Sequence, residues 1–119
     1  MRTQRVFARS AAILASGVLF TSVVASIAHA QDAKQLYEKN CVSCHGASGK
    51  GDGPTGKVLK PPPVDFATAL KGKSDADITK VIKEGGKAVG KSATMPGYGS
   101  KLSGDQIQAV TQYVKGLVK

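Results

Sequence analysis

The sequence predicts a small all-α domain, and three observations lead to this fold class. Three segments, which begin near residues 32, 74 and 103, repeat apolar side chains at spacings of three and four, the period of a helix with one buried face. No convincing pair of alternating strands is present. The 119 residues include only three Phe, three Tyr and no Trp, a poor supply for an aromatic core. Because domains of this size bury little apolar surface, they usually need a staple, a metal or a cofactor.

The first helix is expected to run from about Asp32 into the cysteine-containing segment at residues 41–45. Asp32 is a suitable N-terminal cap, because its carboxylate can accept hydrogen bonds from free backbone N–H groups of the first turn. A buried stripe at helical spacing follows, and it consists of Ala33, Leu36, Tyr37 and Cys41. The cysteines are therefore expected near the C-terminal end of a helix.

Two further helices begin with capping boxes, in which two side chains three residues apart satisfy free backbone donors of the first turn. One helix starts at Ser74-x-x-Asp77 and is expected to stop at Gly85-Gly86. The other starts at Ser103-x-x-Gln106 and has the strongest helical pattern of the chain. Their apolar faces consist of Ile78, Val81 and Ile82 in one and of Ile107, Val110, Val114 and Leu117 in the other.

The segments between the helices, residues 45–63 and 87–101, are expected to be irregular. The first contains many glycines and the run Pro61-Pro62-Pro63, and the second is rich in Gly, Ser and Lys. Two long loops in so short a domain indicate that the loops have a function. Wrapping a bound group is such a function.

Residues 1–30 have the pattern of a secretory signal peptide. Arginines without any acidic residue precede an uncharged stretch from Ser10 to Ala28, and Ala28-His29-Ala30 supplies the small-x-small cleavage pattern. We expect cleavage after Ala30, export to the periplasm and a mature domain of residues 31–119. One alternative is an uncleaved membrane anchor, since about eighteen uncharged residues are long enough to span a bilayer. A mitochondrial transit peptide is disfavoured, because the apolar block lacks interleaved arginines.

The most informative motif is the run Cys41-Val42-Ser43-Cys44-His45, because Cys-x-x-Cys-His is the attachment signature of a c-type haem. On a helix, positions 41, 44 and 45 share one face. Cys41 and Cys44 are therefore expected to form thioether bonds to one porphyrin, while His45 reaches the iron. The alternatives are a zinc site, which needs four ligands, a thioredoxin-like redox pair and a structural disulfide. Residues 31–119 offer only two Cys and one His, too few for a closed zinc site. No βαβ pattern surrounds the pair, as a thioredoxin-like site requires, and a disulfide would leave His45 unexplained.

A second axial ligand is available as well. Without residues 1–30, His45 is the one histidine and Met95 the one methionine of the chain. Haem iron in electron carriers is often held by one His and one Met, a pair that raises the reduction potential. Pro96 biases Met95 away from helix and stiffens its loop. The alternative is that Met95 only fills a gap in the core, as most methionines do.

Together these motifs resemble those of a class I c-type cytochrome over essentially all of residues 31–119. Three stretches carry the resemblance: residues 36–46 around the haem motif, residues 51–61 with Gly51-Asp52-Gly53-Pro54, and Thr94-Met95-Pro96. The resemblance implies a small cytochrome c fold, in which three to five helices wrap around one covalently attached haem c. Its cofactor-binding residues would be Cys41, Cys44, His45 and Met95, with His45 and Met95 as the iron ligands.

The resemblance also implies three local contacts. The first and last helices would cross closely, with Ala33 and Tyr37 against Val110, Tyr113 and Val114. A proline carbonyl, at Pro54 or Pro61, would accept the proton on the far nitrogen of His45. Tyr98 would either reach a haem propionate or stand exposed in its loop.

The function expected from these features is single-electron transfer by a soluble, monomeric periplasmic shuttle that is not an enzyme. Residues 31–119 contain 14 lysines and 8 acidic residues, a formal net charge of +6. This charge favours transient docking to acidic redox proteins or membrane respiratory complexes, with no nucleic acid and no stable membrane insertion after signal removal. The lysines expected around the haem edge are Lys57, Lys60, Lys87, Lys91 and Lys101.

Two other functions remain open. The chain could be a haem c subunit or module of a dehydrogenase or oxidase complex, which shares the same chemistry and differs only in the docking partner. A gas-binding or peroxidase-like haem protein is the other possibility. It is disfavoured, because residues 31–119 contain no Arg and no second His to act as a distal acid or base.

Overall fold

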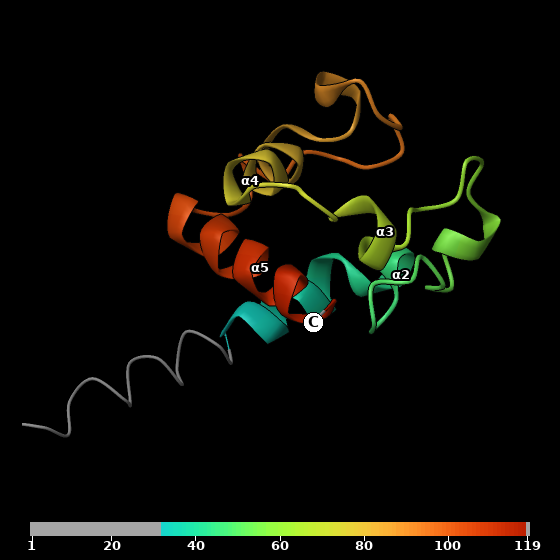
Figure 1. Cartoon of the computed structure of the whole chain (residues 1–119), viewed down its shortest axis with the longest axis horizontal. Coiled ribbons are helices and arrows are strands. Elements are labelled where there is room, and N and C mark those ends of the chain that lie inside the picture. Colours follow the sequence, from blue (N-terminus) through green and yellow to red (C-terminus); the bar gives the residue numbers. More distant parts are fainter. Residues whose placement is uncertain (1–31, 119) are drawn as a thin grey trace, which may run out of the picture.

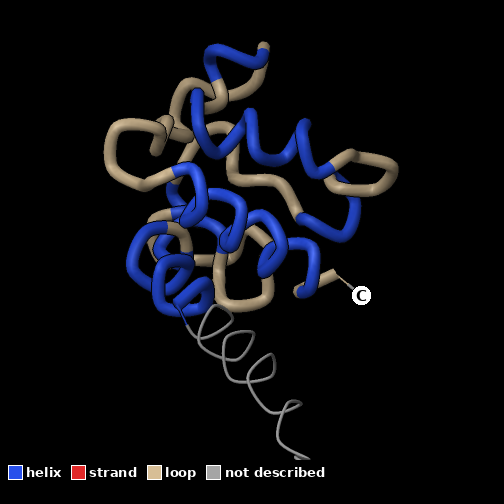
Figure 2. Tube along the Cα trace, turned by 90° about the vertical axis from the view of Figure 1, so that its left-hand side faces the viewer, coloured by secondary structure: helices blue, strands red, loops and turns tan. Residues whose placement is uncertain are grey.

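The computed structural model describes residues 32–118, and the expected signal peptide and its cleavage site lie outside them. Within the described residues the structure is helical, without strands (Figures 1 and 2). Residues 32–40 form the first helix, and its last turn leads into the cysteine motif. The elements that follow are α2 (Val42–His45), η1 (Gly56–Val58), α3 (Phe66–Ala69), α4 (Asp75–Glu84), η2 (Lys87–Val89) and α5 (Gly104–Gly116). The predicted all-α fold is thus confirmed.

Both predicted capping boxes are present. In α4, Ser74 Oγ accepts a hydrogen bond from the N–H of Asp77 over 3.1 Å, and Asp77 accepts one from the N–H of Ser74 over 3.1 Å. In α5, Ser103 and Gln106 exchange the corresponding bonds over 3.2 and 2.9 Å. The helix α4 also ends where the sequence predicted, at Gly85, whose φ of 84° excludes most other residues.

The first helix differs from the prediction at two described positions, Asp32 and Cys41. Asp32 is itself helical, so the prediction that it caps the helix was wrong. At the other end the helix breaks at Cys41 and resumes as α2. The chain then turns at Gly46, which has a φ of 77° and whose carbonyl accepts a hydrogen bond from the buried Tyr37 hydroxyl over 2.7 Å. This hydrogen bond holds the end of the cysteine-containing segment against the first helix.

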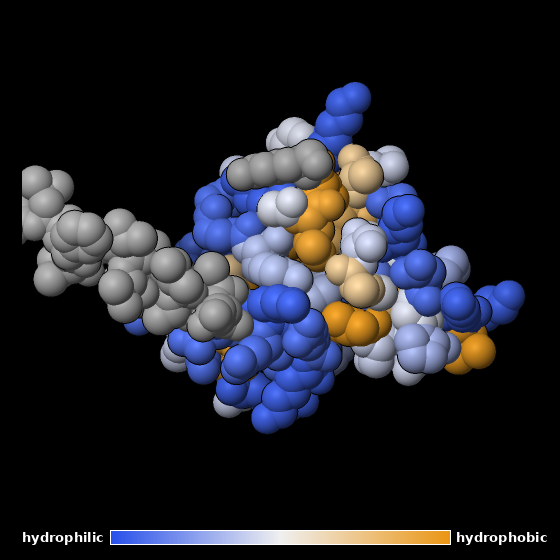
Figure 3. All heavy atoms as spheres, turned by 90° about the horizontal axis from the view of Figure 1, so that it is seen from below, coloured by the Kyte–Doolittle hydropathy of each residue, from blue (hydrophilic) through white to orange (hydrophobic). Residues whose placement is uncertain are grey.

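The core lies where the first helix, α3, α4 and α5 meet. Its buried members are Tyr37, Phe66, Ile78, Ile82, Ile107, Val110 and Val114. The predicted crossing of the first and last helices is confirmed, because the rings of Tyr37 and Tyr113 pack with centroids 5.2 Å apart. Hydrophilic residues cover much of the face seen from below, around a smaller hydrophobic area (Figure 3).

Three short elements were not predicted: η1 and η2 lie in the two segments that were expected to be irregular, and α3 lies in residues 64–73, for which no element was expected. The helix α3 has its own cap, since Asp65 Oδ1 accepts a hydrogen bond from the N–H of Ala67 over 2.8 Å. Across residues 32–118, no helix combines the length and apolar character that crossing a membrane requires.

Candidate haem site

Two adjoining cavities lie between the helical core and the two long loops. The first has a volume of about 370 Å³ and the second about 250 Å³. Cofactor sites typically occupy roughly 300–1,000 Å³. Five residues line both cavities, and three of them are predicted site residues: Cys41, His45, Val64, Lys91 and Met95. The fourth predicted residue, Cys44, lines the second cavity. The fold therefore brings together all four residues that the sequence analysis singled out.

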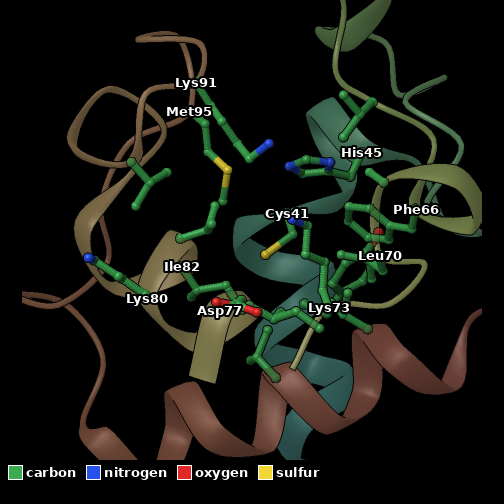
Figure 4. Close-up of a pocket in the computed structure, with 18 residues that line it drawn as sticks. Cys41, His45, Phe66, Leu70, Lys73, Asp77, Lys80, Ile82, Lys91 and Met95 are labelled. Atoms are coloured by element: carbon green, nitrogen blue, oxygen red, sulfur yellow. The ribbon is translucent and has the colours of Figure 1, made fainter. Parts of the chain in front are cut away.

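His45 extends from α2 into the first cavity from one side, and Met95 extends from its loop on the other (Figure 4). The imidazole packs against Phe66, with ring centroids 4.8 Å apart and planes 32° from parallel. Burial lowers the pKa of His45, so the ring is held in the neutral form that binds metals. His45 therefore presents a neutral imidazole at the wall of the cavity.

The predicted hydrogen bond from His45 to a proline carbonyl is wrong for this structure. Nδ1 of His45 is buried and has no hydrogen-bond partner among the described residues. The loop at Pro54 is instead tied to the backbone of α2, because the N–H of Thr55 donates to the carbonyl of Ser43 over 2.8 Å. The second contact that usually fixes the orientation of a metal-binding imidazole is therefore absent among the described residues.

The two cysteines are free thiols. Burial, and then the neighbouring Cys44, raise the pKa of Cys41 to about 11. Cys41 is therefore neutral at physiological pH and is not poised for thiolate chemistry of the thioredoxin kind. In addition, no group of three His, Cys, Asp or Glu residues within the described part of the chain is placed to hold a metal ion. The zinc and thioredoxin-like alternatives thus gain no support.

Met95 is held by the C-terminal end of α4, where the last carbonyls of a helix lack intrahelical partners. The N–H groups of Tyr98 and Gly99 donate to the carbonyls of Ile82 and Lys83 over 2.9 and 3.0 Å. The N–H of Gly86 in turn donates to the carbonyl of Met95 over 3.0 Å. Bonds on both sides of Pro96 thus fix the loop to a helix end, and with it the position of the Met95 thioether.

Tyr98 is not exposed in its loop, and its hydroxyl is bound to the protein backbone, so neither predicted environment of Tyr98 is found. Its side chain is half-buried, and its hydroxyl donates a hydrogen bond to the carbonyl of Asn40 over 2.8 Å. Asn40 directly precedes Cys41. Tyr98 therefore connects the loop that carries Met95 to the helix that carries the cysteine motif.

Phe66 is a site residue that sequence reasoning missed. Its ring is 7% exposed, belongs to the core and stacks on His45. One signal was available, because Phe66 is the one phenylalanine that residues 31–119 contain. The Asp at position 65 marks the start of its short helix by the same capping chemistry as the longer ones.

The cavity walls fit a large flat apolar group. Apart from Cys41, His45 and Met95, the first cavity is lined mainly by aliphatic and aromatic side chains from α3, α4 and α5, among them Phe66, Leu70, Ile78, Ile82 and Val110. The two cavities together are lined by two thiols, one imidazole and one thioether. This donor set matches covalent attachment and His/Met ligation of haem iron.

Comparison with known proteins identifies the family to which the chain is similar. The family model described as "Cytochrome C oxidase, cbb3-type, subunit III" matches residues 28–114. Cytochrome c6 of Microcystis aeruginosa is 34% identical over 83 residues, which cover 70% of this chain and 90% of that protein. The subunit CcoP of the cbb3-type cytochrome c oxidase of Azospirillum brasilense is 28% identical over 90 residues, but these are 76% of this chain and 29% of CcoP. The chain thus spans less than a third of that relative.

Solved structures with a similar fold also include c-type cytochromes. The c-type cytochrome KustC0563 aligns with a TM-score of 0.57 and 27% identity, over 74% of this chain and 99% of that one. A chain of the Kuenenia stuttgartiensis reducing HAO-like protein complex Kustc0457/Kustc0458 aligns with a TM-score of 0.64 and 29% identity, over 77% of this chain and 44% of that one. The chain therefore belongs to the c-type cytochrome family, whose members transfer electrons through covalently bound haem c, and it has the fold of a small class I member.

Proposed function

We propose that residues 31–119 form a soluble periplasmic electron shuttle, which is exported by a signal peptide cleaved after Ala30, works as a monomer and is not an enzyme. Cys41 and Cys44 would attach the haem, and His45 and Met95 would be its axial ligands. Bound haem supplies a metal that exchanges one electron. The observation that carries the proposal is that His45 and Met95 face the same cavity from opposite sides, while Cys41 lines it between them (Figure 4).

The chain's own contribution is to keep these groups in place. His45 is fixed by α2 and by the ring of Phe66, and Met95 is fixed by the hydrogen bonds at the end of α4. Two ligands on rigid supports would change position little between redox states, which favours fast electron exchange. They would also leave no open coordination position for substrate, and this argues against peroxidase-like or gas-binding chemistry.

The distribution of charge supports an acidic partner. Residues 32–118 contain thirteen lysines and eight acidic residues. Five lysines lie in two segments without any acidic residue, 53–64 and 85–103, here called the lysine loops; the remaining eight lysines are balanced by the eight acids. The net positive charge of the described residues therefore lies on these loops, which also provide most of the lining of the second cavity. The five lysines are Lys57, Lys60, Lys87, Lys91 and Lys101.

The lysine loops also carry apolar surface. Val58 and Val64 are 74% and 56% exposed, and both lie in the first lysine loop. Exposed apolar side chains on a positively charged loop are suited to short-lived contact with an acidic redox protein, because charge steers the encounter and the apolar groups contribute attraction without a large interface.

A carbon monoxide experiment tests the shuttle directly. The reduced protein should bind carbon monoxide slowly or not at all at neutral pH, because Met95 occupies the position that the gas needs. Met95→Ala should bind it rapidly. Rapid binding by the unaltered protein would contradict the proposal.

A second candidate function is a haem-carrying module of a larger redox complex. The match to the oxidase subunit family and the 29% coverage of CcoP favour it. Size-exclusion chromatography of the protein purified from its own membrane and periplasmic fractions separates the two candidates. A monomer in the periplasmic fraction supports the shuttle, and co-elution with membrane subunits supports the module.

A further inference from the structure

Lys91 is the one charged residue that lines both cavities. It lies on the same loop as Met95, and Figure 4 shows its side chain extending past Met95 toward the ring of His45. The other four residues that line both cavities are apolar, sulfur-containing or, as His45, kept neutral by burial. Lys91 is also exposed, so its ammonium group stands at the mouth of the site and is the one charge that the two cavities share.

The backbone at Lys91 is well anchored. The N–H of Lys91 donates to the carbonyl of Gly86 over 2.8 Å, directly beyond the end of α4. Gly90 precedes it in the left-handed conformation, with a φ of 72°, and turns the chain into this position. The backbone position of Lys91 is thus set by the same helix end that fixes the Met95 loop.

No carboxylate of the described residues pairs with Lys91, since the two ion pairs found there are Lys34–Glu38 and Lys115–Asp75. Two other lysines line the first cavity, Lys73 and Lys80, but both lie beside Asp77. Hydrogen bonds from Ser74 and, to a lesser extent, these two lysines lower the pKa of Asp77, so their charges are already partly compensated. Lys91 has no comparable neighbour, because residues 85–103 contain no acid.

We propose that Lys91 is a positioning residue that forms an ion pair with a propionate carboxylate of the haem. This inference rests on the proposed function, because it requires haem in the two cavities. A porphyrin with two ionised carboxylates must place them where cations or water can stabilise them, and an apolar cavity offers few such places. Lys91 would also compensate negative charge close to the iron, which favours the reduced state.

The test uses the purified haem protein and three variants: Lys91→Gln, Lys91→Arg and the matched control Lys87→Gln. Lys87 lies on the same loop and has the same charge, but it lines neither cavity. The first readout is the ratio of reduced to oxidised protein in a fixed redox buffer. The second is the propionate bending mode in the resonance Raman spectrum.

Lys91→Gln should lower the reduced-to-oxidised ratio about fivefold, since a charge at the cavity mouth acts through a medium less polar than water. It should also shift the propionate mode, whereas Lys91→Arg should resemble the unaltered protein and Lys87→Gln should change the ratio less than twofold. Equal effects of Lys91→Gln and Lys87→Gln would overturn the proposal. So would a changed ratio with an unchanged propionate mode, because the lysine would then act without contact.

A failure of the proposed function would give a different result from a failure of the Lys91 proposal. In that case the unaltered protein would contain no covalent haem, or its spectrum would lack the band of a methionine–iron bond, before any variant is compared. If the Lys91 amine instead of Met95 were bound to the iron, the methionine–iron band would also be missing. That result would contradict both proposals.

Discussion

The hydroxyl of Tyr98 donates a hydrogen bond to the carbonyl of Asn40 over 2.8 Å, across 58 positions of sequence. The bond joins the loop that holds Met95 to the last turn before Cys41, and so connects the two sides of the proposed haem site. The carbonyl of Asn40 lies where the first helix breaks at Cys41, and a helix end has carbonyls that need partners. The Tyr98 hydroxyl is the hydrogen-bond partner of this carbonyl.

Tyr98→Phe should therefore lower the free energy of unfolding by about 1 kcal/mol, the usual net value of such a bond. The methionine–iron band should also disappear at a lower temperature or denaturant concentration than in the unaltered protein, because the Met95 loop loses one of its supports. Thermal and guanidinium unfolding, followed by far-ultraviolet circular dichroism and by this band, measure both effects.

The matched control is Tyr113→Phe. Tyr113 packs on Tyr37, but its hydroxyl makes no hydrogen bond to any described residue. If the two variants lose equal stability, the Tyr98 bond contributes nothing of its own.

Gly85 contacts the Met95 loop, and a substitution there can test whether this contact holds the loop in place. It has φ 84° and ψ 168°, a region open essentially to glycine alone, and an added Cβ would lie 2.7 Å from the N of Gly97 and 3.0 Å from the O of Met95. Gly85→Ala should cost about 2–3 kcal/mol of unfolding free energy and should weaken the methionine–iron band.

Gly90→Ala serves as the control for backbone strain alone. Gly90 also has a positive φ, 72°, but an added Cβ would meet nothing within 4 Å. A cost of about 1 kcal/mol is expected there. Similar losses for both variants would mean that contact with the Met95 loop is unimportant.

The acid dependence of stability should depend on Asp75, which joins α4 to α5. Hydrogen bonds from Lys115 and Gln112 lower the pKa of the Asp75 carboxyl below its usual value near 3.8. A carboxyl with a lowered pKa in the folded state adds stability above its unfolded pKa, and this contribution is lost as the pH falls through the folded value. Unfolding measured between pH 6 and pH 2 should therefore show a loss of stability below about pH 4.

Asp75→Asn should flatten that acid limb. Lys115→Gln removes the largest cause of the lowered pKa and should make the loss of stability on acidification smaller, because the folded and unfolded pKa values of Asp75 then lie closer together. An unchanged acid limb in Asp75→Asn would show that other carboxyls govern the acid response.

The lysine loops should control association with an acidic redox partner. Lys57→Gln/Lys60→Gln should slow the second-order rate of electron transfer to such a partner at low salt, and the difference from the unaltered protein should vanish as salt screens the charges. Stopped-flow kinetics over a range of ionic strength measure this rate.

Lys34→Gln/Lys39→Gln is the matched control. It removes the same charge from the first helix, where lysines are balanced by acids, so it should have a smaller effect. Equal effects of the two pairs would mean that only total charge matters.

The sequence was sufficient wherever structure is decided locally. The capping boxes at Ser74 and Ser103 predicted the starts of α4 and α5, because the donors that they satisfy lie within the same four residues. Gly85 predicted the end of α4 for a similar reason, since its conformation excludes side chains. The proximity of Cys41, Cys44 and His45 could also be predicted from their spacing in the sequence, although the helix breaks at Cys41.

Sequence reasoning failed where long-range contacts decide. The bond from Tyr98 to Asn40, the stacking of Phe66 on His45 and the unpaired Nδ1 of His45 join segments that no local pattern relates. The short elements η1, α3 and η2 were missed because three or four residues are too few to show a hydrophobic period.

The absorption spectrum of the oxidised protein tests the central claim most directly. We expect the red methionine–iron charge-transfer band in the unaltered protein, its loss in Met95→Ala, and a pyridine haemochrome spectrum typical of two thioether links. A band that persists in Met95→Ala, or a natively exported chain whose mass includes no haem, would contradict the assignment of Cys41, Cys44, His45 and Met95.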